Sequence, residues 1–439
     1  MWEDLVLSAF VNAFRTPDLR RKLLFVLGVI VVFRLGSVMP APGVDVANVR
    51  DCVDQAAAAT GENGVFNLIN AFSGGALLQL TVFALGIMPY ITASIILQLL
   101  TVVIPRLETL KKEGQSGQAK ITQYTRYLTL GLAVLQATGI VALARSGGLI
   151  QGCTQPLLYR PDSTFSTILL VVIMTAGTAV VMWLGELITD RGVGNGMSLL
   201  IFTQIVATFP GTMWLIGQQQ GWVTFSIVVV IGLAIMAAVI FIEQSQRRIP
   251  VQYARRMVGR RMFGGSSTYI PLKVNQAGVI PVIFASSLLY LPALATQFNP
   301  SAPYTGFIER YLVQGDHPVY MATYFAMIVF FTYFYVAITF NPEEVADNMK
   351  KYGGFIPGIR AGKPTEEYLA YVLSRITAPG ALYLGIVALI PLIALALVGA
   401  NQNFPFGGAS ILIIVGVALD TVKQIESQLQ QRNYEGFLR

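Results

Sequence analysis

The most restrictive feature of this sequence is a set of apolar runs, each about as long as a membrane-spanning helix. One of them, from Thr81 to Ile104, has 24 residues and no charged side chain. A helix needs roughly 20 apolar residues to cross a hydrocarbon core of about 30 Å. A soluble domain does not need so much apolar chain, so the runs predict a membrane protein.

Composition over the whole chain agrees with this prediction. Of the 439 residues, 54% are hydrophobic and 12% are charged, and the mean hydropathy is +0.62. Windows of the required length predict an all-α polytopic membrane protein with ten transmembrane helices. The windows cover about residues 23–42, 77–104, 122–145, 166–189, 197–215, 223–243, 277–297, 318–340, 372–397 and 408–427.

The Lys and Arg residues predict which loops face the cytoplasm. If the amino terminus lies there, the same side receives 25 of the 30 basic residues. The opposite loops then hold only Arg50, Arg145, Arg160 and Arg310, and Arg34 is left inside the first window. Because basic residues collect on the cytoplasmic side of membrane proteins, we expect both termini in the cytoplasm.

The windows divide into two sets of five around the polar stretch from Gly217 to Trp222. We therefore expect two halves, residues 1–220 and 221–439. Since five is odd, the halves would be inverted relative to each other in the membrane. Inverted halves commonly form a path at their interface, and secondary transporters share this feature.

One apolar segment, Phe66 to Leu77, is too short to cross a membrane and contains a glycine pair. It either lies in the external interface or folds back between the helices, where protein or water must cover its backbone. The residues by themselves leave both alternatives open.

Two cytoplasmic loops are longer than a helix connection requires. Residues 244–275 contain three Arg pairs among β-branched and aromatic residues, which predicts a protruding ribbon with Arg260 and Arg261 at its tip. Residues 341–371 begin with a predicted short helix, Glu343 to Lys351. Membrane topology alone would place some basic residues here. Guanidinium groups so far from the spans also suit RNA phosphates or a partner's carboxylates.

The sequence contains no recognisable catalytic or metal-binding motif. His317 is the only histidine, no G-x-S-x-G is present, and Gly358 to Thr365 lacks the spacing of a phosphate-binding loop. Arg34 is taken as the only clearly charged residue of the spans, so no carboxylate relay is expected. We therefore expect no enzyme, no cofactor, no metal site and no energy source within the chain. Cys52 and Cys153 fall in predicted external loops, where a disulfide is possible.

Eight blocks, spread over essentially the whole chain, resemble the SecY family, the large subunit of the bacterial protein-conducting channel. They are FRLGSVMPAPGV (Phe33 to Val44), AFSGGAL, FALGIMPYITASIILQLL, KKEGQSGQAKITQYTRY (Lys111 to Tyr127), MWLGELITDRGVGNGMSLLIF (Met182 to Phe202), PLKVNQAGVIPVIFASS (Pro271 to Ser287), FNPEEVADNMKKYGGFIPGIR (Phe340 to Arg360) and FPFGGASILIIV (Phe404 to Val415).

The resemblance implies two five-helix halves around an hourglass pore with a re-entrant plug half-helix. The implied pore ring is Ile87, Ile91, Ile201, Ile283 and Ile413, with Met197 as a further candidate. A narrow ring of aliphatic side chains excludes water and ions because it offers no hydrogen bonds. The implied plug is Phe66, Asn67, Leu68, Ile69, Asn70, Ala71, Phe72, Ser73, Gly74 and Gly75, which favours the re-entrant alternative for that segment.

The resemblance also implies a lateral gate between the second and third spans on one side and the seventh and eighth on the other. Its polar residues would be Thr92, Gln98, Asn275, Ser287 and Tyr290. Such groups contribute only about 0.6–2 kcal/mol each between helices in a membrane, so an entering apolar segment is able to separate them.

The implied function is that of a passive channel in the bacterial cytoplasmic membrane. It would pass unfolded secretory polypeptides across the lipid bilayer and release apolar segments of nascent membrane proteins sideways into lipid. The implied partners are SecE, SecG, signal sequences, the SecA ATPase and the ribosome, the last two docking at Arg260, Arg261 and Arg360. The alternative is a secondary transporter for a small solute, which would need a binding site of ionisable or unwound-backbone ligands at mid-membrane.

Overall fold

The computed structural model describes residues 16–49, 51–52, 76, 79–146, 156–159, 163–253, 256–258, 261–263, 267–298, 303–313, 317–398 and 408–437. The predicted plug, residues 66–75, lies outside these ranges, and so do Arg260 and Cys153.

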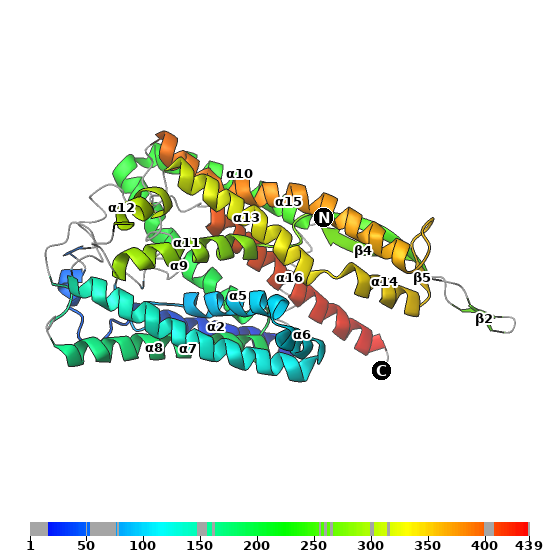
Figure 1. Ribbon diagram of the computed structural model, residues 1–439, viewed down its shortest axis with the longest axis horizontal. Coiled ribbons are helices and arrows are strands. Elements are labelled where there is room, and N and C mark those ends of the chain that lie inside the picture. The colour runs from blue at the N-terminus through cyan, green and yellow to red at the C-terminus, as the bar shows by residue number, and fades with distance from the viewer. Residues whose placement is uncertain are drawn as a thin grey trace.

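Long helices make up most of the described chain and run roughly along its longest axis (Figure 1). Up to residue 244 they are α2 (Pro17–Val38), α5 (Met88–Val103), α6 (Pro105–Lys112), α7 (Gln115–Ser146), α8 (Thr164–Arg191), α9 (Gly196–Gln220) and α10 (Trp222–Gln244). The predicted linker between the halves is shorter than expected. Gly221, with a φ of +87°, is the single residue between α9 and α10.

The remaining elements include all the described strands. They are β1 (Gln246–Tyr253), β2 (Arg256–Val258), β3 (Arg261–Phe263), β4 (Ser267–Lys273), α11 (Ile280–Phe298), α12 (Thr305–Ile308), the π-helical turn η1 (Glu309–Val313), α13 (Pro318–Thr339), α14 (Pro342–Lys351), β5 (Gly354–Phe355), α15 (Lys363–Val398) and α16 (Gly408–Phe437).

Each of the ten apolar windows overlaps one of the described helices. Within the described residues, five helical segments are long and apolar enough to cross a membrane: Gln115–Arg145, Thr164–Arg191, Phe225–Gln244, Pro318–Lys351 (α13 continued by α14) and Lys363–Ile390. A sixth span results if α5 and α6, which bend by 100° at their junction, are counted as one broken span. The prediction of an all-α, multi-pass membrane fold is confirmed, whereas the number ten stays a prediction.

Local sequence signals explain where many of these helices begin. Proline occupies the first turn of α2, α5, α6, α13 and α14, where its missing N–H needs no partner. Asn195 caps α9 by accepting a hydrogen bond of 3.0 Å from the backbone N–H of Met197. Asn341 caps α14 in the same way, through the N–H of Glu343 at 3.2 Å. The helix predicted at Glu343 to Lys351 is thereby confirmed.

The hydropathy of the second apolar window predicts one continuous helix, but the structure does not have one there. Residues 79–87 form turns, and α5 begins only at Met88. Leu80 and Gly86 have positive φ angles of 47° and 54°, which an α-helix does not accommodate. Pro89 therefore lies at the start of the helix and not at a bend within it.

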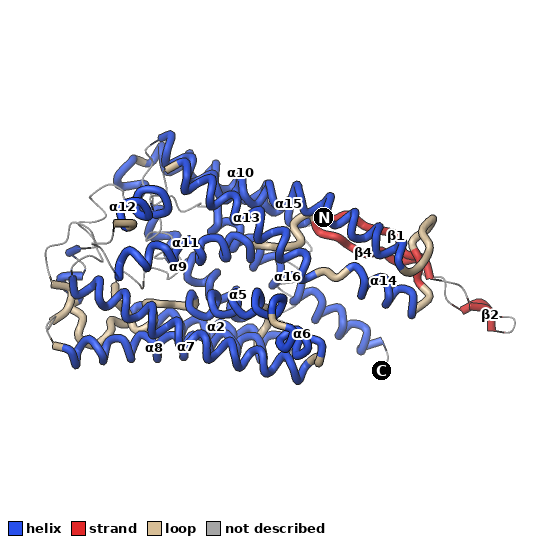
Figure 2. Tube along the Cα trace, viewed as in Figure 1, coloured by secondary structure: helices blue, strands red, loops and turns tan. Residues whose placement is uncertain are grey.

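The predicted cytoplasmic ribbon is present and protrudes from one end of the helices (Figures 1 and 2). Strands β1 and β4 pair antiparallel, with Gln246 opposite Lys273 and Ile249 opposite Ile270. Farther out, β2 and β3 form a second antiparallel pair. A small apolar cluster, which includes Ile249, Leu272 and Leu369, packs the ribbon's base against α15.

Apolar side chains also cover the outer surface of several helices. On α10, Val223 and Phe241 are each 76% exposed, and only 11% of its most apolar window is buried. Such a surface is unfavourable in water and suited to lipid tails. The main core lies between the helices and contains Phe33, Leu80, Ile87 and Leu200 among its most enclosed side chains.

Candidate functional site

The five predicted ring isoleucines come from four separate parts of the chain and lie in one apolar core. Ile87 precedes α5, Ile91 lies in it, and Ile201, Ile283 and Ile413 come from α9, α11 and α16. Four of the five are at most 7% exposed, and Ile91 is partly buried against the same core. The four buried isoleucines therefore do not lie on the lipid-facing exterior.

The backbone leading to Ile87 is positioned by close contacts with α2 and α8. A Cβ atom added to Gly36 would meet the ring of Phe83, and one added to Gly177 would meet the carbonyl oxygen of Val82. Phe83 also stacks on Phe33 of α2, with ring centroids 6.0 Å apart. Glycine at both positions lets the helices approach this turn closely enough to hold it.

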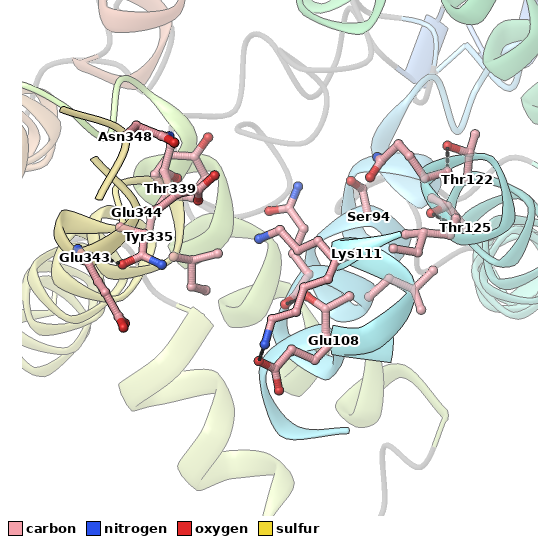
Figure 3. A pocket seen from close by; sticks show the side chains of 18 of the residues that line it. Ser94, Glu108, Lys111, Thr122, Thr125, Tyr335, Thr339, Glu343, Glu344 and Asn348 are labelled. Carbon is pink, nitrogen blue, oxygen red and sulfur yellow. Dashed lines mark hydrogen bonds and ion pairs between the residues drawn. The ribbon is translucent and has the colours of Figure 1, made fainter. Parts of the chain in front are cut away.

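A large polar cavity of about 990 Å³ lies between α5, α6 and α7 on one side and α13 and α14 on the other. In Figure 3, Ser94, Lys111 and Thr122 face Tyr335 and Glu344 across it. The predicted gate residue Gln98 is exposed and lines the same cavity. The cavity thus lies between α5 and α7 on one side of the predicted seam and α13 on the other.

Charged side chains on α6 and α14 line this cavity. Lys112 Nζ lies 2.7 Å from Glu108 Oε1, and this hydrogen bond lowers the pKa of the Glu108 carboxyl. Glu343, Glu344 and Asp347 line the α14 side. The charged residues of α6 and of α14 all lie outside the predicted apolar windows.

The helices of the predicted gate are neighbours, since α11 packs against both α5 and α7. Thr92 is buried and donates a hydrogen bond of 3.0 Å to the carbonyl of Met88 in its own helix. Ser287 is 4% exposed, and its Oγ has no hydrogen-bond partner. Tyr290 belongs to α11, but its side chain lies outside the described part.

Asn275, the fifth residue predicted for the gate, is hydrogen-bonded to a helix outside the predicted seam. Its Nδ2 donates to Glu243 Oε1 of α10 at 2.6 Å and to the carbonyl of Gly278 at 3.1 Å. Glu243 and Asn275 line a second cavity of about 520 Å³, together with Lys273 and Asp420. Asn275 therefore joins the turn before α11 to α10, an interaction that the sequence motifs did not indicate.

An ion pair joins α7 and α8. Arg126 donates from Nε and Nη2 to the two carboxylate oxygens of Glu186, at 2.9 and 2.8 Å. The expectation that Arg34 is the only clearly charged residue of the spans is wrong, because Arg126, Glu186 and Glu243 lie inside the third, fourth and sixth windows. A charged residue near the end of an apolar run was the sequence signal for this pair.

The remaining predicted residues lie on the ribbon and in the loops. Arg261 is the first residue of β3, although its side chain is outside the described part, and Arg360 is exposed in the turn before α15. Cys52 is buried and disulfide-bonded. Within the described residues, no group of three or more His, Cys, Asp or Glu side chains is arranged to hold a metal ion.

Comparison with known proteins gives one consistent result. The SecY family model matches residues 81–422. The protein translocase subunit SecY of Streptomyces coelicolor is 68% identical over 440 residues, covering 99% of this chain and all of that protein. A solved protein-conducting channel has a TM-score of 0.64 at 22% identity, covering 92% of this chain and 91% of the other. Sec61 in the canine ribosome-channel complex has a TM-score of 0.59 at 20% identity, with the same coverage.

Proposed function

Because this chain belongs to the SecY family, we propose that it is the channel subunit through which a protein translocase passes unfolded secretory polypeptides. Apolar segments of those polypeptides would leave sideways into the bilayer. The predicted halves, residues 1–220 and 221–439, would surround the path. Residues 66–75 would form its plug.

The main structural support is that the five isoleucines, from separate parts of the chain, pack in one core, four of them buried and Ile91 partly buried. A collar of branched aliphatic side chains offers no hydrogen bonds, so it excludes water and ions while closed. The same side chains carry no charge or fixed polar group, so they tolerate a passing chain of any sequence. Sealing without recognition is what a polypeptide channel requires.

The geometry between α5, α7 and α11 supports a lateral gate at the seam. Thr92 and Ser287 are buried on neighbouring helices, and Gln98 faces the adjacent cavity. We propose that Thr92, Gln98, Asn275, Ser287 and Tyr290 line the gate. Asn275 would act at its end, by holding the turn before α11.

A small-solute transporter is the weaker alternative. Such a carrier binds its substrate at mid-membrane through ionisable side chains or unwound backbone. The proposed constriction is aliphatic instead, and the family is that of a translocase subunit.

The energy for transport would come from partners, because we propose no enzymatic activity for this chain. The protruding ribbon and the loop containing Arg360 are suited to docking SecA or the ribosome. SecE and SecG would complete the membrane complex. Membership of the SecY family supports a location in the bacterial cytoplasmic membrane, and the positive-inside bias supports a topology with both termini inside.

Serine substitution of the proposed constriction tests this function. The variant with Ile87→Ser, Ile91→Ser and Ile413→Ser should show a higher ion conductance than wild type when the complex is reconstituted in planar bilayers. A matched control replaces three exposed isoleucines, Ile227, Ile231 and Ile386, with serine. Equal conductance in the two triple variants would contradict the constriction. Failure of vesicles that contain the wild-type complex to import a secretory precursor would contradict the function itself.

A further inference from the structure

Gln204 is a buried glutamine whose side-chain amide has no hydrogen-bond partner. It lies in α9, its side chain is 0% exposed, and neither Oε1 nor Nε2 is paired. A glutamine amide offers two donor hydrogens and an acceptor oxygen, and leaving these groups unpaired away from water is costly. If the position only needed filling, leucine or methionine would do so without that cost.

The amide lies against the non-helical backbone of residues 79–87. A Cβ atom added to Gly86 would lie 2.7 Å from Nε2 of Gln204, so the side chain directly contacts this glycine. Gly86 has a φ of +54°. In the same stretch Leu80, fully buried, has a φ of +47°, which a residue with a side chain rarely adopts. The unpaired amide therefore contacts Gly86, at the end of a non-helical stretch whose beginning contains the strained residue Leu80.

Backbone hydrogen bonds hold the two ends of this stretch differently. At its beginning, the N–H of Ala41 donates to Leu80 at 3.0 Å, and the N–H of Val82 donates to Met39 at 3.0 Å. Near its end, the N–H of Gly86 bonds locally to Phe83 at 2.8 Å. Non-helical backbone at membrane depth must find its partners within the protein. If the end near Gly86 moves, the amide of Gln204 is the adjacent group that can both donate and accept.

The position of Gln204 connects it to the proposed constriction. Ile87 directly follows Gly86. Ile201 precedes Gln204 by three residues in α9, so Ile201 and Gln204 lie on one face of that helix. We infer that Gln204 is a gating residue whose unpaired amide disfavours the conformation described here and pairs with the backbone of residues 79–87 when the constriction opens. This inference rests on the proposed function, in which Ile87 and Ile201 belong to the constriction.

Removing the amide while keeping the apolar volume tests the inference. In planar bilayers that contain the complex, a synthetic signal peptide at fixed concentration opens the channel, and potassium chloride conductance reports the open fraction. Gln204→Leu and Gln204→Met should each lower that fraction roughly 5- to 100-fold, the ratio that corresponds to one buried, unsatisfied amide. The thermal unfolding temperature should stay equal to that of wild type or rise, which shows that both variants are folded.

A matched control is Gln136→Leu, which replaces a buried glutamine of α7 and should leave the open fraction unchanged. An unchanged or raised open fraction in both folded Gln204 variants would overturn the inference, because a residue with a merely structural role changes only the unfolding temperature. A separate Ile413→Ser variant, measured in the same bilayers, distinguishes failure of this inference from failure of the proposed function. If Ile413→Ser raises the resting leak but Gln204→Leu has no effect, gating by Gln204 fails and the constriction stands; if Ile413→Ser causes no leak, the constriction fails first.

Discussion

The side-chain amide of Asn275 donates a 2.6 Å hydrogen bond to the carboxylate of Glu243, and both side chains are at least nine-tenths buried. Asn275 follows β4 by two residues, and Glu243 lies at the end of α10. Beside this pair, Lys273 of β4 lies 3.6 Å from Asp420 of α16. The base of the ribbon therefore contacts two of the long helices, α10 through a buried hydrogen bond and α16 through an exposed ion pair.

Loss of the Asn275 amide should destabilise the protein. Asn275→Ala leaves the buried carboxylate of Glu243 without its donor, so we expect a loss of about 1–3 kcal/mol in the free energy of unfolding. The measurement is thermal unfolding of the purified protein in detergent. The double variant Asn275→Ala with Glu243→Leu should recover part of the loss, because no buried charge remains. If its loss in unfolding free energy equals the sum of the two single losses, the coupling between the two residues is contradicted.

The ion pair between Arg126 and Glu186 should contribute modestly to stability. Its geometry is bidentate, but the Arg126 side chain is 42% exposed, which lets water screen the charges. We expect Arg126→Gln to lower the free energy of unfolding by about 0.5–1 kcal/mol, and less at high salt. The exposed pair of Lys112 and Glu108 is the comparison, and Lys112→Gln should have no measurable effect.

Close packing of α8 on the turn before α5 predicts different effects for two glycine substitutions. Gly177→Ala places a methyl group against the backbone carbonyl of Val82, which cannot move aside as a side chain would. We expect it to lower the unfolding free energy by about 1–3 kcal/mol. Gly131→Ala in α7 meets nothing within 4 Å and should instead raise it by about 0.5–1 kcal/mol. Equal unfolding temperatures for the two variants would rule out the contact.

The proposed gate predicts that a covalent bond across the seam stops export. Cysteines at Thr92 of α5 and Tyr290 of α11 should form a crosslink, because these two helices pack together. Export of a secretory precursor into vesicles should then cease and return on addition of a reductant. The single Thr92→Cys variant controls for the substitution itself. Normal export through fully crosslinked protein would exclude this seam as the gate.

Docking on the ribbon predicts a strong dependence on its basic tip. Replacing Arg260 and Arg261 with glutamate should weaken stimulation of the SecA ATPase and binding of ribosomes. The glutamate carboxylates would repel the anionic groups that the two arginines are proposed to bind on either partner. Arg310→Glu, in the turn η1 on the side predicted to face outward, should leave these partner activities unchanged. Full partner activity in the tip variant would mean that these charges only orient the protein in the membrane.

The sequence by itself determined the fold class, the family, the approximate positions of the helices and the protruding ribbon. These properties are local in the chain. Hydropathy over about 20 residues decides whether a segment enters the membrane, and a proline or an asparagine decides where helices such as α5 and α14 begin.

Only the tertiary structure decided that Asn275 bonds to Glu243 and that Gly177 packs closely against the carbonyl of Val82. It also decided that the amide of Gln204 is buried beside Gly86 without a hydrogen-bond partner. Each of these relationships joins residues far apart in the chain, and each depends on distances of a few ångströms between packed helices. Hydropathy averages over a whole turn or more, so it carries no information at that scale.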